Sequence, residues 1–144
     1  MSHRIAFSGE GSSITIEVFD YENPLAKHPD DVSWLKAAVT VQAGPFSGTF
    51  KTSVTTHDLA ALGEQMGQAL QSLSQRISFQ TTEGDLTLNV NFSKTGKVQI
   101  EGIAQPCGTV KTALQCRFES DPSTLDQTVR ELKLVTKRFP AKQV

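Results

Sequence analysis

Apolar residues recur along this chain with two different spacings, and the spacing predicts the local structure. They recur at every second position in most of the sequence, which is typical of strands with one buried face, and at every third or fourth position in two segments, which is typical of amphipathic helices. The alternating segments are residues 5–7, 14–18, 35–41, 46–54, 77–79, 86–92, 98–102 and 110–118. The helical segments run from Leu59 to Leu73 and from Leu125 to Phe139. The order is four strands, a helix, four strands and a second helix.

Both helices have recognisable start signals. Thr55 and Asp58 resemble a capping box, in which a threonine side chain and an acid three residues later satisfy the first free amides of a helix. Asp121 followed by Pro122 fits an N-cap residue and a proline at the first helical position. We therefore expect the first helix to begin near Thr55 and the second to begin at Pro122.

These elements predict an α+β fold. Consecutive strands joined by short turns favour antiparallel meanders, and alternation in nearly every strand indicates that one sheet face is solvated. We expect one antiparallel sheet of about seven or eight strands, in the order ββββ-α-ββββ-α, with two helices packed on one face. The hydrophobic content of 38% suits such a single layer. Gly63 and Gly67 weaken the first helix, and this predicts that the helix lies tight against the sheet.

Length and charge narrow the class of protein. The 144 residues are the size of one domain, so we expect a single domain over residues 1–144. The net charge is −1, which gives no overall field for nucleic acid or an anionic membrane. No apolar run is long enough for a membrane helix, and no N-terminal apolar run follows a basic region, so we expect no signal peptide. We expect a cytoplasmic protein that binds neither nucleic acid nor membrane.

The charge is uneven along the chain. Residues 1–72 hold four basic and eight acidic side chains, a balance of −4, while residues 73–144 have a balance of +3. Much of the acidic excess lies in or beside residues 20–33, which read as a long loop. This loop is either a solvated surface or an acidic patch that docks a basic partner.

Residues with catalytic or metal-binding chemistry are not grouped in this sequence. The three histidines are far apart, and Cys107 and Cys116 are nine residues apart without a nearby histidine, which is not a metal-ligand spacing. There is no Gly-x-Ser-x-Gly motif and no glycine-rich loop between a strand and a helix. We expect no catalytic residues, no metal, no cofactor and no small-molecule substrate.

One region carries a resemblance to a known family. From Trp34 to Leu62 the chain has a tryptophan, an alternating strand, the pattern Gly-x-Phe-Ser-Gly-x-Phe and then Thr-x-x-Asp-Leu. Glu83-Gly84-Asp85-Leu86, the turn at Gly96-Lys97-Val98 and the run from Phe118 to Leu125 follow in order. Over about residues 34–135 this arrangement resembles the WapI-type immunity proteins of bacteria.

The resemblance implies a non-catalytic cytoplasmic antidote, which binds the C-terminal domain of a bacterial toxin, often a nuclease, and blocks it. A nuclease cleft is basic, so an acidic loop is suited to steer or plug it. We therefore take Asp20, Glu22, Asp30 and Asp31 as candidate partner-binding residues.

Two other interpretations remain open at this point. The first is a non-enzymatic adaptor or chaperone-like binding domain that uses the polar sheet face or a helix groove. The second is an enzyme whose site is assembled from scattered residues, which would require His28, Asp30 and Asp31 to converge in a deep pocket.

Overall fold

The computed structural model describes residues 3–23, 33–72, 75–106 and 111–141. It contains eight strands and two helices in the predicted order. They are β1 (His3–Gly9), β2 (Ser12–Tyr21), β3 (Trp34–Ala43), β4 (Phe46–Thr55), α1 (Thr56–Ser72), β5 (Arg76–Gln80), β6 (Leu86–Phe92), β7 (Val98–Ala104), β8 (Leu114–Ser120) and α2 (Pro122–Arg138). The α+β class and the antiparallel pairing are confirmed. The last strand was expected over residues 110–118; residue 110 lies outside the described residues, residues 111–113 are not in a strand, and the described strand begins at Leu114.

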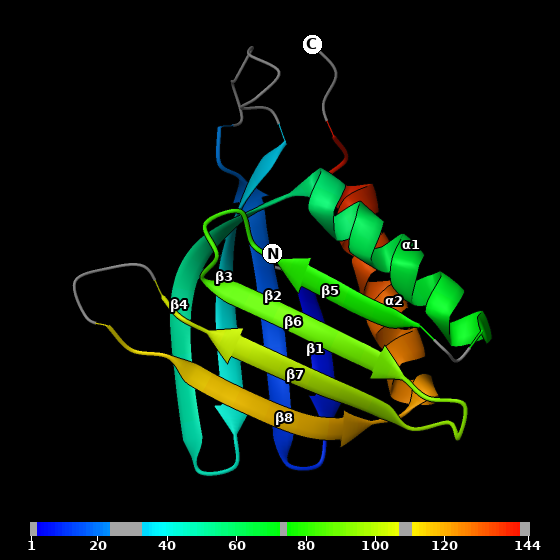
Figure 1. Cartoon of the computed structure of the whole chain (residues 1–144). Helices are drawn as coiled ribbons and strands as arrows, with labels where there is room; N and C mark the ends of the chain where they lie inside the picture. The colour runs from blue at the N-terminus through cyan, green and yellow to red at the C-terminus, as the bar shows by residue number, and fades with distance from the viewer. Residues whose placement is uncertain (1–2, 24–32, 73–74, 107–110, 142–144) are drawn as a thin grey trace.

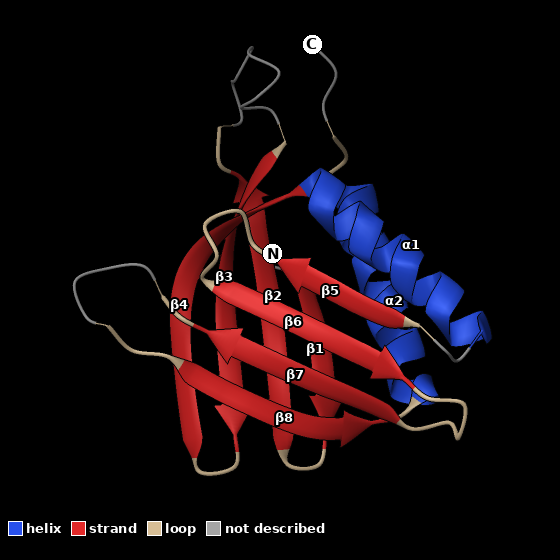
Figure 2. Ribbon diagram, viewed as in Figure 1, coloured by secondary structure: helices blue, strands red, loops and turns tan. Residues whose placement is uncertain are grey.

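The strands form two sheets, so the prediction of one sheet was wrong in this respect. Strands β1 to β4 form sheet A and strands β5 to β8 form sheet B, each a four-stranded meander. In the sequence, helix α1 lies between the two meanders. The strand that follows it, β5, belongs to sheet B rather than to sheet A. In Figures 1 and 2 the strands of sheet B cross in front of those of sheet A.

The two sheets bury their apolar faces against each other and against the helices. Gly102 on β7 marks the close contact, since a Cβ atom at this position would lie 2.4 Å from Cδ1 of Ile14 on β2. The buried residues of both sheets and both helices belong to one continuous core. Alternation along a strand shows which side chains are buried but not what covers them, and this is why the second layer was missed.

The helices lie beside the sheets rather than across the face of one. Both run along one side of the molecule (Figure 1), where α2 contacts β1, and α1 contacts β5 and α2. Thr128 of α2 donates a hydrogen bond from Oγ1 to the carbonyl of Ala6, at 2.6 Å, and Glu131 accepts one from the Ala6 amide, at 2.9 Å. Ala6 is in an edge strand, so α2 satisfies backbone groups that another strand would otherwise bond.

The predicted helix starts are confirmed. Helix α1 begins at Thr56, and Oγ1 of Thr55 accepts a hydrogen bond from the amide of Asp58 at 3.1 Å. Helix α2 begins at Pro122, and the carboxylate of Asp121 accepts one from the amide of Thr124 at 2.8 Å.

Sheet A and sheet B also meet at a corner, at the end of β1. The Ser120 hydroxyl on β8 donates to the carbonyl of Ser8 at 2.6 Å. Gly9 approaches β8 so closely that a Cβ atom there would lie 2.0 Å from the carbonyl oxygen of Glu119. This corner needs a residue without a side chain.

Candidate functional site

Within the described residues no three His, Cys, Asp or Glu side chains come together as a metal site requires. His57 is exposed in the first turn of α1, while His3 packs edge-on against the Phe139 ring with centroids 5.5 Å apart. His28 and Cys107 lie outside the described residues.

Among the described residues three groups have a shifted pKa, and each shift has a structural cause. Burial raises the pKa of the Cys116 thiol, which makes it a poor nucleophile. Burial also raises the pKa of Tyr21, against the opposing effect of Arg138, and its hydroxyl donates to the carbonyl of Pro140 at 2.7 Å. Hydrogen bonds from the Ser123 side chain and the Thr124 amide lower the pKa of Asp121. The described interactions of these three groups hold the fold together, and none is a nucleophile–base pair.

The four acidic residues proposed from the sequence are described only in part. Asp20 is exposed near the end of β2, and its carboxylate accepts a hydrogen bond from the amide of Tyr21. Glu22 is half-buried and accepts a hydrogen bond from the Ser53 hydroxyl of β4 at 2.6 Å. Asp30 and Asp31 lie outside the described residues.

Glu22 lies in a broad hollow on sheet A that the sequence did not reveal. The hollow has a volume of about 870 Å³, and its lining includes Phe19, Lys36 and Lys51. Strand β2 shifts register between Val18 and Asp20, so Phe19 is an extra residue in the pairing with β3. Its ring is 45% exposed. The signal in the sequence was the adjacent apolar pair Val18-Phe19, which interrupts the alternation.

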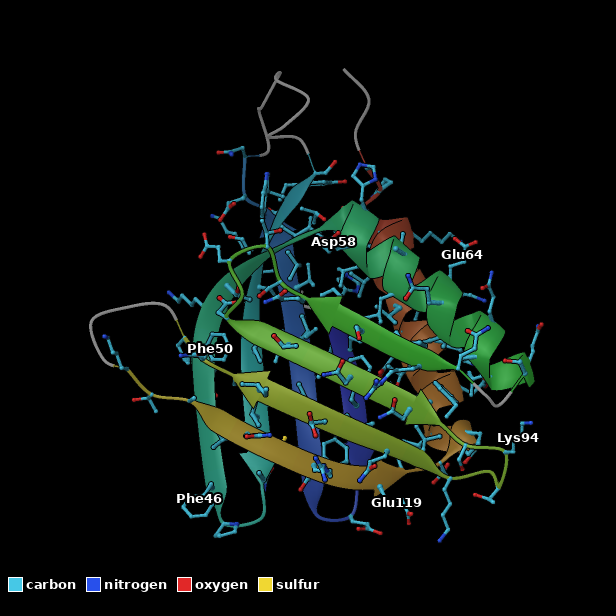
Figure 3. All side chains as sticks on the ribbon, in the orientation of Figure 1. Phe46, Phe50, Asp58, Glu64, Lys94 and Glu119 are labelled. Carbon is cyan, nitrogen blue, oxygen red and sulfur yellow. The ribbon has the colours of Figure 1, made fainter. Side chains whose placement is uncertain are left out.

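A second exposed aromatic surface follows β4. Phe46 is 66% exposed and Phe50 is half-buried, although their positions alternate with the polar ones as buried positions would. In Figure 3 both residues lie on β4, on the side of the molecule away from the helices. A small cavity of about 150 Å³ opens beside Phe50 between the sheets, and its lining includes Ala104 and Leu114. The apolar face of sheet A therefore extends beyond the cover that sheet B provides.

A third depression lies between the helices. It has a volume of about 540 Å³, and its lining includes Gly63, Gly67 and Leu132. A Cβ atom on Gly63 would lie 3.4 Å from Cβ of Leu132 in α2, while a Cβ atom on Gly67 would meet nothing within 4 Å. The expectation that both glycines press α1 against the sheet was wrong, because Gly63 allows close packing against α2 and Gly67 borders an open groove.

Asp85 is a polar residue whose role the sequence analysis missed. It is 3% exposed, and its carboxylate accepts hydrogen bonds from Thr81 and, at 2.6 Å, from Thr52 on β4. The carboxylate therefore ties the turn before β6 in sheet B to sheet A. In the sequence it stood out only as part of the turn Glu83-Gly84-Asp85.

Comparison with known protein families gives the class of this chain. Residues 4–140 match the sequence model of the Immunity protein WapI-like family. The chain belongs to this family. The match confirms the resemblance and extends it to strands β1 and β2, which the resemblance did not cover. No curated protein matches the chain.

Membership of the WapI-like family indicates an immunity function, which is generally non-enzymatic and directed at a protein toxin. In the part of the chain that the structure describes, no helix is long and apolar enough to span a bilayer. The surfaces to consider for a WapI-like protein are therefore docking surfaces: the hollow at Phe19, the exposed side of β4 and the groove between the helices.

Proposed function

We propose that this protein is an immunity protein that binds and neutralises a cognate bacterial toxin domain, in a stoichiometric protein–protein complex. The observation that carries this proposal is the family match over residues 4–140. Several open, partly apolar surfaces support it, because a protein inhibitor needs a stable fold and an exposed contact surface rather than reactive groups. The protein acts in the cytoplasm, without a cofactor, on the C-terminal domain of a polymorphic toxin.

A nuclease is the toxin class that the charge distribution suits best. The substrate cleft of a nuclease is basic, and the acidic side chains of Asp20, Glu22, Asp30 and Asp31 would accelerate encounter with such a surface. Lys36 and Lys51 line the same hollow as Glu22, so the acidic region is bounded rather than continuous.

The acidic residues are tested by charge reversal. Changing all four to lysine should slow association with the toxin domain and flatten the dependence of the association rate on salt, as stopped-flow fluorescence measures. Replacing Glu119, an acidic residue on β8, with lysine is the matched control. An unchanged rate in the fourfold variant would place the electrostatic contact elsewhere.

The immunity function is tested by co-expression. The gene for the toxin is expected directly upstream, and its C-terminal domain should arrest growth when it is expressed alone. Co-expression of this protein should restore growth, and the two should purify together at a one-to-one ratio. Growth arrest despite full expression of the folded protein would contradict the proposal.

A chaperone-like binding domain is the second candidate, and the open groove between α1 and α2 is the observation that favours it. The two functions differ in the fate of the complex. An immunity protein keeps the toxin inactive in a lasting complex, whereas a chaperone releases an active client.

A further inference from the structure

Strand β4 has a free edge in the described part of the chain, where it is the last strand of sheet A and pairs with β3 alone. The opposite edge, β1, is bonded by Thr128 and Glu131 of α2, and α1 lies against β5. Hydrogen bonds from Glu10 and Ser120 join the end of β8 to the β1–β2 corner. Among the described residues, no hydrogen bond of this kind reaches the outward edge of β4, and Pro106 and Thr112 line the small cavity together with Ser47 and Thr49.

The register shows which backbone groups of β4 face outward. A two-residue turn at Gly44-Pro45, with φ of 59° at Gly44, joins β3 to β4, so the closing pair Ala43 and Phe46 exchanges both backbone hydrogen bonds. Hydrogen-bonded pairs then alternate along an antiparallel ladder. The N–H and C=O groups of Ser47, Thr49, Lys51 and Ser53 consequently point away from β3.

The side chains beside this edge define two different environments. On the inner side, Phe46 is 66% exposed and Phe50 is half-buried at the mouth between the sheets. On the outer side, Lys51 is exposed at the edge strand and lines the hollow with Lys36, Glu22 and Glu83, of which Glu22 accepts a hydrogen bond from Ser53, the residue paired with Lys36. An added strand would lie about 4.8 Å from β4, with successive side chains on alternate faces. It would therefore meet aromatic rings on one face and the Lys51 ammonium group of the edge strand on the other.

We propose that the free edge of β4 takes up an extended segment of the toxin domain as a fifth strand of sheet A. The segment alternates apolar residues, which pack on Phe46 and Phe50, with polar residues, one of which is acidic and faces Lys51. Main-chain hydrogen bonds to Thr49 and its outward-facing neighbours hold it, in the manner of strand addition. Lys51 opposes pairing with an identical edge and attracts an acidic side chain on a foreign one. This inference rests on the proposed immunity function.

The backbone contribution is tested with Thr49→Pro. Proline removes the outward N–H of Thr49 and keeps the bonds to β3, so an edge strand tolerates it. The dissociation constant for the purified toxin domain, measured by isothermal titration calorimetry, should rise by about tenfold or more. Thr49→Ser keeps the amide and should stay within about threefold. Circular dichroism checks that both variants fold.

The side-chain contribution is tested with two matched pairs. Phe46→Ser should weaken binding by about tenfold or more, whereas Leu134→Ser should not, because Leu134 is 62% exposed on α2, at the other side of the molecule. Lys51→Glu should weaken binding and slow association, whereas Lys94→Glu, in the turn before β7, should change neither (Figure 3). These two pairs keep the test decisive if Thr49→Pro does not fold.

The outcomes separate this inference from the proposed function. If the wild-type protein binds the toxin domain and all three β4 variants bind equally well, the strand-addition proposal is overturned while the immunity function stands. If the wild-type protein does not bind, the proposed function itself fails. If sedimentation shows a dimer that Thr49→Pro converts to a monomer, the edge joins two copies of this chain, and the proposal of a toxin strand is wrong.

Discussion

At the scale of single residues, the positions where the two sheets come closest leave the least room for a side chain. Gly9 faces a backbone carbonyl, at 2.0 Å from an added Cβ atom, and Gly102 faces the flexible end of Ile14, at 2.4 Å. A backbone atom in a paired strand cannot move aside, whereas a terminal methyl group can rotate. The two glycines are therefore required for the same geometric reason but to different degrees.

We predict that Gly9→Ala destabilises the protein more than Gly102→Ala. The free energy of unfolding should fall by about 3 kcal/mol for the first variant and by about 1 kcal/mol for the second, which are typical costs of severe and mild overpacking. Urea denaturation measures both values, and Gly48→Ala, where an added Cβ atom meets nothing within 4 Å, is the control. Equal losses at Gly9 and Gly48 would contradict the close contact with Glu119.

Asp121 gives a pH prediction at the same scale. The folded state lowers the pKa of this N-cap carboxylate below its ordinary value of 3.8, so its stabilising contribution is complete above pH 3.8 and is lost as the pH falls through the lowered value. Asp121→Asn keeps an N-cap acceptor without the charge. Its unfolding free energy should therefore fall less steeply than that of the wild type below pH 3.8, as urea denaturation at several pH values measures.

The Ser123→Ala variant refines this test. The Ser123 hydroxyl donates to the Asp121 carboxylate at 2.6 Å and is the largest cause of its lowered pKa. This variant should therefore have an acid dependence between those of the wild type and Asp121→Asn. Identical pH dependence in all three proteins would show that Asp121 does not couple to folding.

At the scale of elements, the two helices protect the edges of the sheets. Helix α2 bonds both backbone groups of Ala6 through Thr128 and Glu131, which closes β1 to other strands. Strand β4 has no comparable hydrogen bond at its outer edge in the described part of the chain, and of its aromatic residues Phe46 is exposed and Phe50 is half-buried. The uneven protection of the two edges of sheet A is the basis for assigning binding to β4.

We predict that Thr128→Val lowers the unfolding free energy by about 1 kcal/mol, because the partly buried carbonyl of Ala6 loses its side-chain donor. Thr136→Val on the same helix is the matched control. The Thr136 hydroxyl bonds only the Leu132 and Lys133 carbonyls of its own helix, so its loss should cost less than about 0.5 kcal/mol. Differential scanning calorimetry compares the two, and similar melting temperatures would mean that α2 does not depend on this contact.

At the scale of the whole molecule, one core joins both sheets and both helices. Buried residues from β1 to α2 form a continuous cluster, and the Asp85 carboxylate adds a polar link from sheet B to Thr52 of sheet A. A meander of four strands alone would expose its entire apolar face. Neither half is expected to be stable without the other.

We therefore predict that the protein unfolds in a single cooperative step. Fluorescence of Trp34 in sheet A and far-ultraviolet circular dichroism of the whole chain should give the same urea midpoint. A fragment of residues 1–72 should show no cooperative transition. Two separate midpoints, or a folded fragment, would divide the chain into two domains and contradict the single domain expected for residues 1–144.

The sequence alone determined the class, the order and the local boundaries of the elements. Alternation, helical spacing and capping residues such as Thr55 and Asp121 are local properties, because each depends on neighbours within a few positions. The same patterns, taken with their turns, also carried the family resemblance that the match over residues 4–140 confirms. A local signal was therefore sufficient to suggest a binding protein rather than an enzyme.

Only the tertiary structure decided which surfaces cover one another. Three features depend on how distant segments pack: the division into two sheets, the hydrogen bond from α2 to β1 and the exposure of Phe46. The sequence does not reveal them, because a strand has the same period of two whether its apolar face is covered or open. Phe46 and Val54 share a face of β4 and the same alternating pattern, yet one is 66% exposed and the other 1%. The difference arises because sheet B crosses sheet A at an angle and leaves one end of β4 uncovered (Figure 1).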